Sequence, residues 1–82
     1  MKAPDFELKI ISAEKTLFGG KITTVTLPGT QGSFSVLPDH APLVSSLSAG
    51  VIEYNDGTQA ATIEINGGFV DVNRNVVTIC VE

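Results

Sequence analysis

Asp39 and His40 stand side by side between Pro38 and Pro42 and are the strongest candidates for acid–base chemistry in the sequence. An imidazole titrates near neutral pH, so His40 could serve as a general base or a pH switch oriented by Asp39. Neighbouring side chains on an extended chain point apart, however, and an active site needs a pocket and further groups. The two prolines instead predict a stiff corner, with Asp39 in a left-handed conformation and the His40 imidazole bonded to backbone.

The other residue types that do chemistry lack the spacing that chemistry needs. No serine lies in the Gly-x-Ser-x-Gly arrangement of a nucleophile elbow, and the carboxylates are dispersed without the spacing of a calcium loop. Gly19-Gly20 and Gly67-Gly68 precede no expected helix, so a phosphate-binding loop is disfavoured. Cys80 cannot form an internal disulfide and is expected to be a buried small residue. We therefore expect no catalytic residue, cofactor or metal site, and the sequence favours a binding or structural module.

Charge and hydropathy exclude several partners. The 82 residues carry five basic and nine acidic side chains, and the basic residues are scattered, which disfavours nucleic acid. A net charge of −4 also argues against adsorption on anionic lipid and direct lipid insertion. No apolar run approaches the roughly 20 residues that span a bilayer, and no apolar signal core follows the N-terminus. A single lone histidine cannot build a zinc site.

Alternating apolar and polar residues predict an all-β fold. The pattern has period two at 6–10, 61–65 and 77–81, and turn residues separate these short runs. Many short strands indicate a sandwich or a barrel, and two packed sheets would avoid leaving an apolar face in water. The fold class is therefore expected to be a two-sheet β-sandwich in one domain over residues 1–82.

Three local features refine this expectation. The apolar phase slips between Ile22 and Val25, which predicts a bulge or a strand that changes sheets. Asn55-Asp56-Gly57 is the clearest hairpin, because Asp-Gly tolerates the positive φ angles of a tight primed turn. Both faces of 76–81 are largely apolar, so this strand is expected to be covered on each side.

An ordered series of motifs resembles the N-terminal domain of the F-type ATP synthase epsilon subunit, whose mitochondrial equivalent is called delta. The resemblance rests on three segments in this order and covers essentially the whole chain: Leu27-Pro28-Gly29 with Gly32, Leu37-Pro38-Asp39-His40-Ala41-Pro42-Leu43-Val44, and Gly67-Gly68-Phe69-Val70-Asp71-Val72. It implies a sandwich of about ten short strands. It also implies a non-catalytic subunit of the F1F0 central stalk (the rotor), on the cytoplasmic face of a bacterial inner membrane.

The same resemblance implies the partners and their contact residues. The subunit would link the gamma subunit to the ring of c subunits and so couple ion translocation to ATP synthesis. Ser12, His40 and Ser45 would lie at or near the gamma contact. Gln31, Gly32 and Ser33 would approach the polar loops of the c ring.

The chain also departs from the family pattern. Ser33 stands where many relatives carry an acidic residue, and Asp39 stands where glycine is frequent. Most relatives continue into a C-terminal helical hairpin that can restrain ATP hydrolysis, whereas this sequence stops at Glu82. If it is the complete product, we expect the hairpin and its inhibition of hydrolysis to be absent.

Two other classes of function stay open at this stage. A stand-alone β-sandwich could bind a small ligand such as a carbohydrate, and clustering of Tyr54 with an exposed phenylalanine in a groove would favour it. An enzyme centred on His40 would need a concave pocket that holds a second titratable group.

Overall fold

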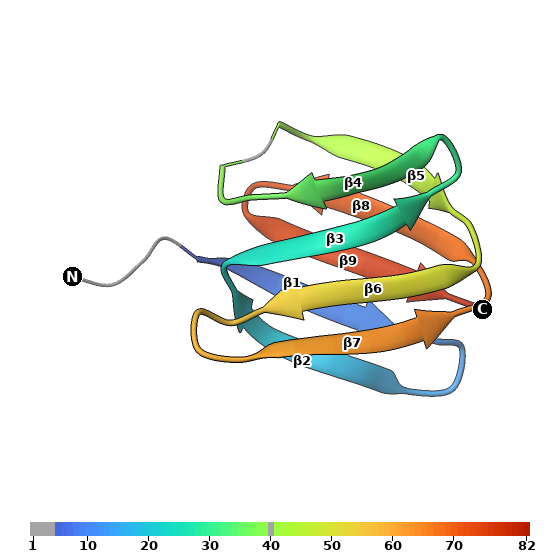
Figure 1. Cartoon of the computed structure of the whole chain (residues 1–82), viewed down its shortest axis with the longest axis horizontal. Helices are drawn as coiled ribbons and strands as arrows, with labels where there is room; N and C mark the ends of the chain where they lie inside the picture. Colours follow the sequence, from blue (N-terminus) through green and yellow to red (C-terminus); the bar gives the residue numbers. More distant parts are fainter. Residues whose placement is uncertain (1–4, 40) are drawn as a thin grey trace.

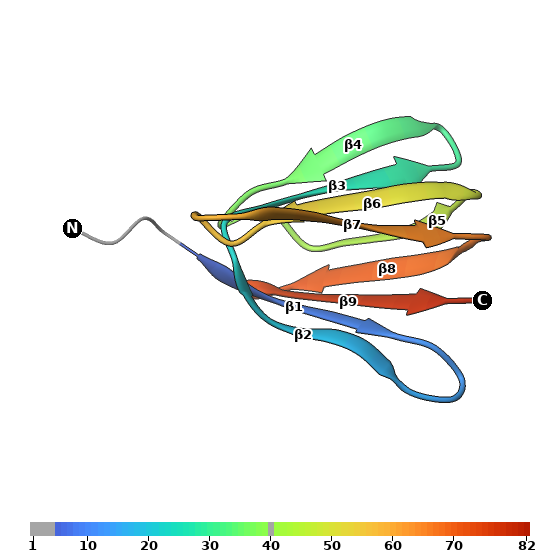
Figure 2. The same ribbon diagram turned by 60° about the horizontal axis from the view of Figure 1, so that its bottom comes forward.

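Nine strands build a two-layered β-sandwich in the computed structural model, which describes residues 5–39 and 41–82 (Figures 1 and 2). The all-β prediction is confirmed. The strands are β1 (Phe6–Ile11), β2 (Thr16–Ile22), β3 (Thr24–Gly29), β4 (Gly32–Val36), β5 (Leu43–Leu47), β6 (Gly50–Asn55), β7 (Ala60–Ile65), β8 (Gly68–Asn73) and β9 (Val76–Val81).

The two layers are parts of one curled sheet. One layer has the strand order β2-β1-β9-β8-β5, and the other has the order β4-β3-β6-β7. The layers are joined where β3 meets β5 at a single bridge, Gly29 to Leu47. Neighbours are antiparallel except β1 and β9, which run parallel. Curling the sheet lets both layers share one core and pairs edges that two separate sheets would leave open.

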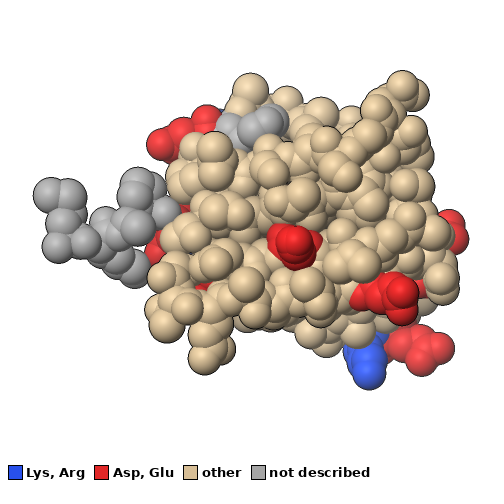
Figure 3. Space-filling model, viewed as in Figure 1, with Lys and Arg blue, Asp and Glu red and all other residues tan. Residues whose placement is uncertain are grey.

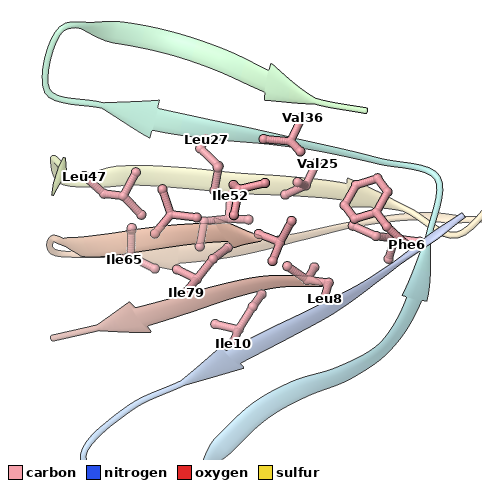
Figure 4. Close-up of a cluster of buried hydrophobic side chains, with 14 residues drawn as sticks. Phe6, Leu8, Ile10, Val25, Leu27, Val36, Leu47, Ile52, Ile65 and Ile79 are labelled. Atoms are coloured by element: carbon pink, nitrogen blue, oxygen red, sulfur yellow. The ribbon is translucent and has the colours of Figure 1, made fainter. Parts of the chain in front are cut away.

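The alternating pattern places one face of each strand in a wholly apolar core (Figure 4). In β1, for example, Phe6, Leu8 and Ile10 are buried while Glu7 and Lys9 are exposed. Within the described part of the chain, no polar or charged side chain is buried. A close-packed apolar interior makes this domain a stiff body without internal chemistry. The core consists of Phe6, Leu8, Ile10, Ile22, Val25, Leu27, Val36, Leu47, Ile52, Ile65, Val70, Val72, Val77 and Ile79.

The phase slip between Ile22 and Val25 is the point at which the chain crosses between layers. Ile22 ends β2 in one layer, and Thr24 begins β3 in the other. Thr23 lies at the crossing, where its backbone N–H and its hydroxyl both donate to the carbonyl of Asn55, at 2.7 and 3.1 Å. These bonds satisfy the backbone at the bend, and the prediction of a strand that changes sheets is confirmed.

The hairpin at Asn55-Asp56-Gly57 is present, but its predicted turn type is wrong. β6 and β7 are joined by four residues, 56–59, rather than by a two-residue primed turn. Only Gly57 has a positive φ in this loop, 98°. Asp56 accepts bonds from the N–H groups of Thr58 and Gln59, each at 2.8 Å, and this arrangement closes the longer loop. The hydrogen bonds of the Asp56 carboxylate thus hold this loop in one conformation, as the positive φ angles would have done in a primed turn.

We predict that Asp56 titrates below the ordinary aspartate value of 3.8. The N–H groups of Gln59 and then Thr58 stabilise the ionised carboxylate and lower its pKa. A lowered folded pKa means that the stabilising contribution is complete above pH 3.8 and is lost as the pH falls through the folded value. An NMR titration should show the amide shifts of Thr58 and Gln59 following this ionisation, and Asp56→Asn should abolish the response. An Asp56 midpoint at or above 3.8 would contradict the assignment.

Candidate functional site

The segment predicted to meet the c ring forms an exposed hairpin tip. Thr30 and Gln31 connect β3 to β4 between the paired residues Gly29 and Gly32. Gly32 has a φ of 127°, which only glycine adopts easily. Gln31, Gly32 and Ser33 are all exposed. The tip is therefore accessible to a partner, because no other part of the described chain covers it.

The base of this hairpin is held firmly against β5. The N–H of Thr30 donates to the carbonyl of Ser46 at 3.2 Å, and the N–H of Ser48 donates to the carbonyl of Pro28 at 2.8 Å. A Cβ on Gly29 would lie 2.8 Å from the Phe34 ring, so glycine allows the ring to pack over the hairpin. The hairpin therefore presents an exposed tip on a base that is bonded to β5.

Ser12, predicted at the gamma contact, lies in the turn between β1 and β2. Its N–H donates to the carbonyl of Lys15 at 2.8 Å, and its Oγ bonds with the same carbonyl at 3.2 Å. The Oγ also accepts from the N–H groups of Glu14 and Lys15, at 3.4 and 3.3 Å. The hydroxyl thus has a structural role in the turn, whether or not a partner also reaches it.

The two described residues of the predicted gamma contact, Ser12 and Ser45, do not converge on one spot. Ser45 is half-buried in β5, on the same side of the strand as the core residue Leu47. His40 lies outside the described residues, but its neighbour Asp39 is at the opposite end of the sandwich from Ser12 (Figure 1). A partner that touches all three regions must therefore lie along the length of the β2-β1-β9-β8-β5 layer.

An exposed apolar patch on the outer face of that layer was not predicted. It consists of Val44 on β5, Phe69 on β8 and Cys80 on β9, with Ile11 on β1 beside them. Val44 is 73% exposed and Phe69 is 52% exposed. Cys80 pairs with Phe69 on one side and with Ile11 on the other, while Val44 pairs with Asp71 and lies diagonally from Phe69. The patch therefore crosses four neighbouring strands and has the Asp71 carboxylate at its margin. Contiguous apolar surface of this kind marks sites where proteins meet.

The patch corrects two expectations about the last strand. Cys80 was expected to be buried, but its side chain is half-exposed on the outer face. The strand was expected to be covered on both faces, yet the chain itself covers only the side of Val77 and Ile79. Burial of the second face requires something other than this part of the chain.

The opposite outer face, on the β4-β3-β6-β7 layer, has a different character. Hydroxyl side chains are common there, and Thr26 and Ser35 bond to each other across β3 and β4 at 2.8 Å. Figure 3 shows separated carboxylates on this face, with lysine or arginine only at its margin. Among the residues of these four strands, Val51 is the one exposed large hydrophobic side chain, and it pairs with Glu64 across β6 and β7. This face carries no comparable apolar patch among the described residues.

A shallow hollow adjoins the apolar patch at the β8–β9 hairpin. Its volume is about 330 Å³, and neither a nucleophilic cysteine nor an aromatic ring lines it. The lining therefore does not form a recognisable catalytic constellation. A partner side chain could be seated there, between the charged groups and the valine. The lining residues are Asp71, Asn73, Arg74, Val76 and Thr78.

The geometry does not favour the carbohydrate alternative. Tyr54 clusters with Phe18, with ring centroids 4.4 Å apart and planes tilted by 46°. Both rings are half-buried and pack against the apolar core, so they join the two layers instead of lining a groove. Within residues 5–39 and 41–82, no three potential metal ligands come together, and no helix is long and apolar enough to cross a membrane.

Comparison with known proteins agrees with the β-sandwich fold. The family model described as "ATP synthase, Delta/Epsilon chain, beta-sandwich domain" matches residues 5–82. The chain belongs to this family. The family assignment accounts for the β-sandwich architecture.

Similar proteins include ATP synthase epsilon chains from bacteria. The chain is 40% identical over 79 residues to that of Leptospira borgpetersenii, covering 96% of this chain and 62% of the relative. It is 42% identical over 77 residues to that of Desulfitobacterium hafniense, covering 94% of this chain and 58% of the relative. The chain therefore spans about three-fifths of the length of these members of the delta/epsilon family.

Solved structures show the same sandwich within ATP synthases. A chain in the Euglena gracilis mitochondrial ATP synthase, from a structure of OSCP, F1 and c-ring, superposes with a TM-score of 0.88 at 25% identity. That match covers 99% of this chain and 53% of the Euglena chain. A chain from the central stalk and c-ring of Tetrahymena thermophila has a TM-score of 0.79 at 16% identity, which supports the delta/epsilon fold alone.

Proposed function

We propose that this chain is the β-sandwich part of a non-catalytic central-stalk subunit of an F1F0 ATP synthase. It would hold the gamma subunit to the c ring, so that ring rotation driven by an ion gradient is transmitted to gamma. The observation that carries this proposal is the match over residues 5–82 to the delta/epsilon family, together with 40% identity to a bacterial epsilon chain. Catalysis would belong to other subunits of the complex.

The gamma contact is proposed for the outer face of the β2-β1-β9-β8-β5 layer. This face carries Val44 and Phe69, which are unusually exposed for their size. It also extends from the turn at Ser12 to the corner at Asp39. An apolar centre with polar margins is the usual anatomy of a protein interface. Ser12 and His40 would then contribute polar contacts rather than most of the binding energy. Ser45 is on the core side of β5 and would lie at the margin of this contact at most.

The c-ring contact is proposed for the β3–β4 hairpin tip. Gln31, Gly32 and Ser33 are exposed at the same end of the sandwich as Ser12, while the hairpin base is bonded to β5. One end of a stiff body could therefore rest on the ring while its flank lies against gamma. We place this assembly on the cytoplasmic face of a bacterial inner membrane, because similar epsilon chains are bacterial.

Co-purification with the gamma subunit of the same organism tests this proposal. We expect a one-to-one complex on size-exclusion chromatography that survives dilution to micromolar concentration. If a well-folded gamma subunit and the chain elute separately, and addition of the c ring does not bring them together, the proposed rotor function is wrong.

A further inference from the structure

Two exposed loops that are far apart in the sequence are bonded to each other at one end of the sandwich. The backbone N–H of Asp39 donates to Asn75 Oδ1 at 2.7 Å. Asn75 Nδ2 donates in return to Asp39 Oδ1 at 3.0 Å. The two residues are 36 positions apart, and both adopt left-handed backbone, with φ of 64° and 61°. Asp39 and Asn75 thus form a reciprocal pair. The side-chain amide of Asn75 accepts from the Asp39 backbone and donates to the Asp39 carboxylate.

Asn75 is itself held rigidly by the sheet. Asn73 pairs with Val76, so Arg74 and Asn75 form a two-residue hairpin loop in which both φ angles are positive. This is the geometry of a type I′ turn, which matches the twist of the strands it joins. The carbonyl of Asn75 also accepts from the N–H of Glu7 at 2.9 Å. Asn75 is therefore anchored to β1, β8 and β9 before it bonds to Asp39.

The pair attaches an otherwise long connection to this anchor. Six residues, 37–42, join the end of β4 to the start of β5, and these strands belong to different layers. β5 carries Val44, the most exposed residue of the apolar patch. The bond from Asp39 to Asn75 therefore fixes Asp39, which precedes β5 in the chain, at the same end of the sandwich as the hollow lined by Arg74.

We infer that Asn75 is a positioning residue for the partner contact, acting through Asp39. The pair holds Asp39 in one conformation before the partner arrives, so less ordering remains to be done on binding. This inference rests on the proposed function for the identity of the partner, the gamma subunit. The pairing itself is a property of the free chain and can be measured without any partner.

An exchange of the two side chains tests the inference. Asn75→Asp removes the amide donor and places a second carboxylate against Asp39, and we expect it to weaken gamma binding about tenfold. In the double variant Asp39→Asn with Asn75→Asp, the bond between the two side chains is restored with donor and acceptor reversed, and the backbone N–H of residue 39 still donates to residue 75. We therefore expect its affinity to return to within about twofold of wild type. Aspartate and asparagine both tolerate the left-handed backbone, so neither change strains the loops.

Asn55→Asp is the matched control at the same end of the molecule. Asn55 Oδ1 accepts from the N–H of Gly57 at 2.7 Å, a bond that a carboxylate also accepts. The same change of charge should therefore leave gamma binding and unfolding unaltered there. Equal loss of affinity in Asn55→Asp and Asn75→Asp would mean that charge alone is responsible, and the inference would be wrong.

Amide hydrogen exchange in the free chain separates positioning from the proposed function. In Asn75→Asp the two facing carboxylates should repel each other and move the loops apart, so the Asp39 amide should exchange about tenfold faster although residue 75 keeps an acceptor. The rate should return towards the wild-type value in the double variant, while core amides keep their protection. If exchange follows this pattern but no variant, nor the wild-type chain, binds gamma, the proposed function is contradicted and the pairing still stands. Wild-type exchange at Asp39 in Asn75→Asp, or unrestored binding in the double variant, would overturn the inference.

Discussion

Replacing Phe69 with aspartate is expected to weaken binding to the gamma subunit by about 100-fold or more while leaving the sandwich folded. Phe69 is 52% exposed at the centre of the apolar patch, between Cys80 on β9 and Ser46 on β5. A carboxylate there would have to be desolvated against the partner surface without a counter-charge. The core is not touched, so the sandwich should stay folded, at a cost of about 1–2 kcal/mol for the loss of the half-buried ring and the low strand propensity of aspartate. Isothermal titration calorimetry and circular dichroism measure the two quantities.

A pair of valines supplies the matched control for this prediction. Val44 lies in the apolar patch, whereas Val51 is 48% exposed on the opposite layer. Val44→Asp should weaken gamma binding strongly, and Val51→Asp should not. If Val51→Asp is the variant that abolishes binding, the partner lies on the β4-β3-β6-β7 face and the interface proposed here is wrong.

Gly68→Ala is expected to cost at least about 3 kcal/mol of folding free energy. Gly68 begins β8 with a φ of 151°, in a region that side chains rarely adopt. An added Cβ would also collide with the carbonyl oxygen of Cys80 and lie 3.0 Å from the Cα of Val81. These are backbone atoms of β9, a strand paired on both sides, so they cannot move aside cheaply. In a domain of this size the melting temperature should fall by more than about 12 °C.

Gly19→Ala is the control for the loss of a glycine. Gly19 lies in β2 with no atom within 4 Å of an added Cβ and no positive φ. The alanine should be neutral or stabilise the domain by up to about 1 kcal/mol, because it restricts the unfolded chain. Thermal unfolding followed by circular dichroism compares the two variants. Similar melting temperatures for both variants would show that the close approach of β8 to β9 does not restrict position 68 to glycine.

Local patterns allowed much of the fold to be predicted. The phase slip between Ile22 and Val25 predicted the crossing between layers, because a period-two pattern cannot continue on a new face without an interruption. The prolines around Asp39 predicted its left-handed backbone, which has a φ of 64°. These features depend on residues close together in the chain, so the sequence contains most of the information that determines them.

Features that depend on distant residues could not be predicted in this way. The parallel pairing of β1 with β9 joins the first and last strands, and no local signal marks it. The bonds between Asp39 and Asn75 require two loops to meet, which only the finished fold determines. The apolar patch could not be predicted for a related reason. Alternation shows that a strand has two faces, but not whether the chain covers the second one.

Retention of F1 on membranes tests the central claim most directly. Inner-membrane vesicles are stripped of F1 and incubated with an F1 preparation that contains gamma but lacks the epsilon subunit, with and without this chain. We expect the chain to sediment with the vesicles together with F1, to restore ion pumping driven by ATP, and to fail in both when it carries Phe69→Asp. Equal retention and pumping with the wild-type chain, the Phe69→Asp variant or no chain at all would contradict the claim that it joins gamma to the c ring.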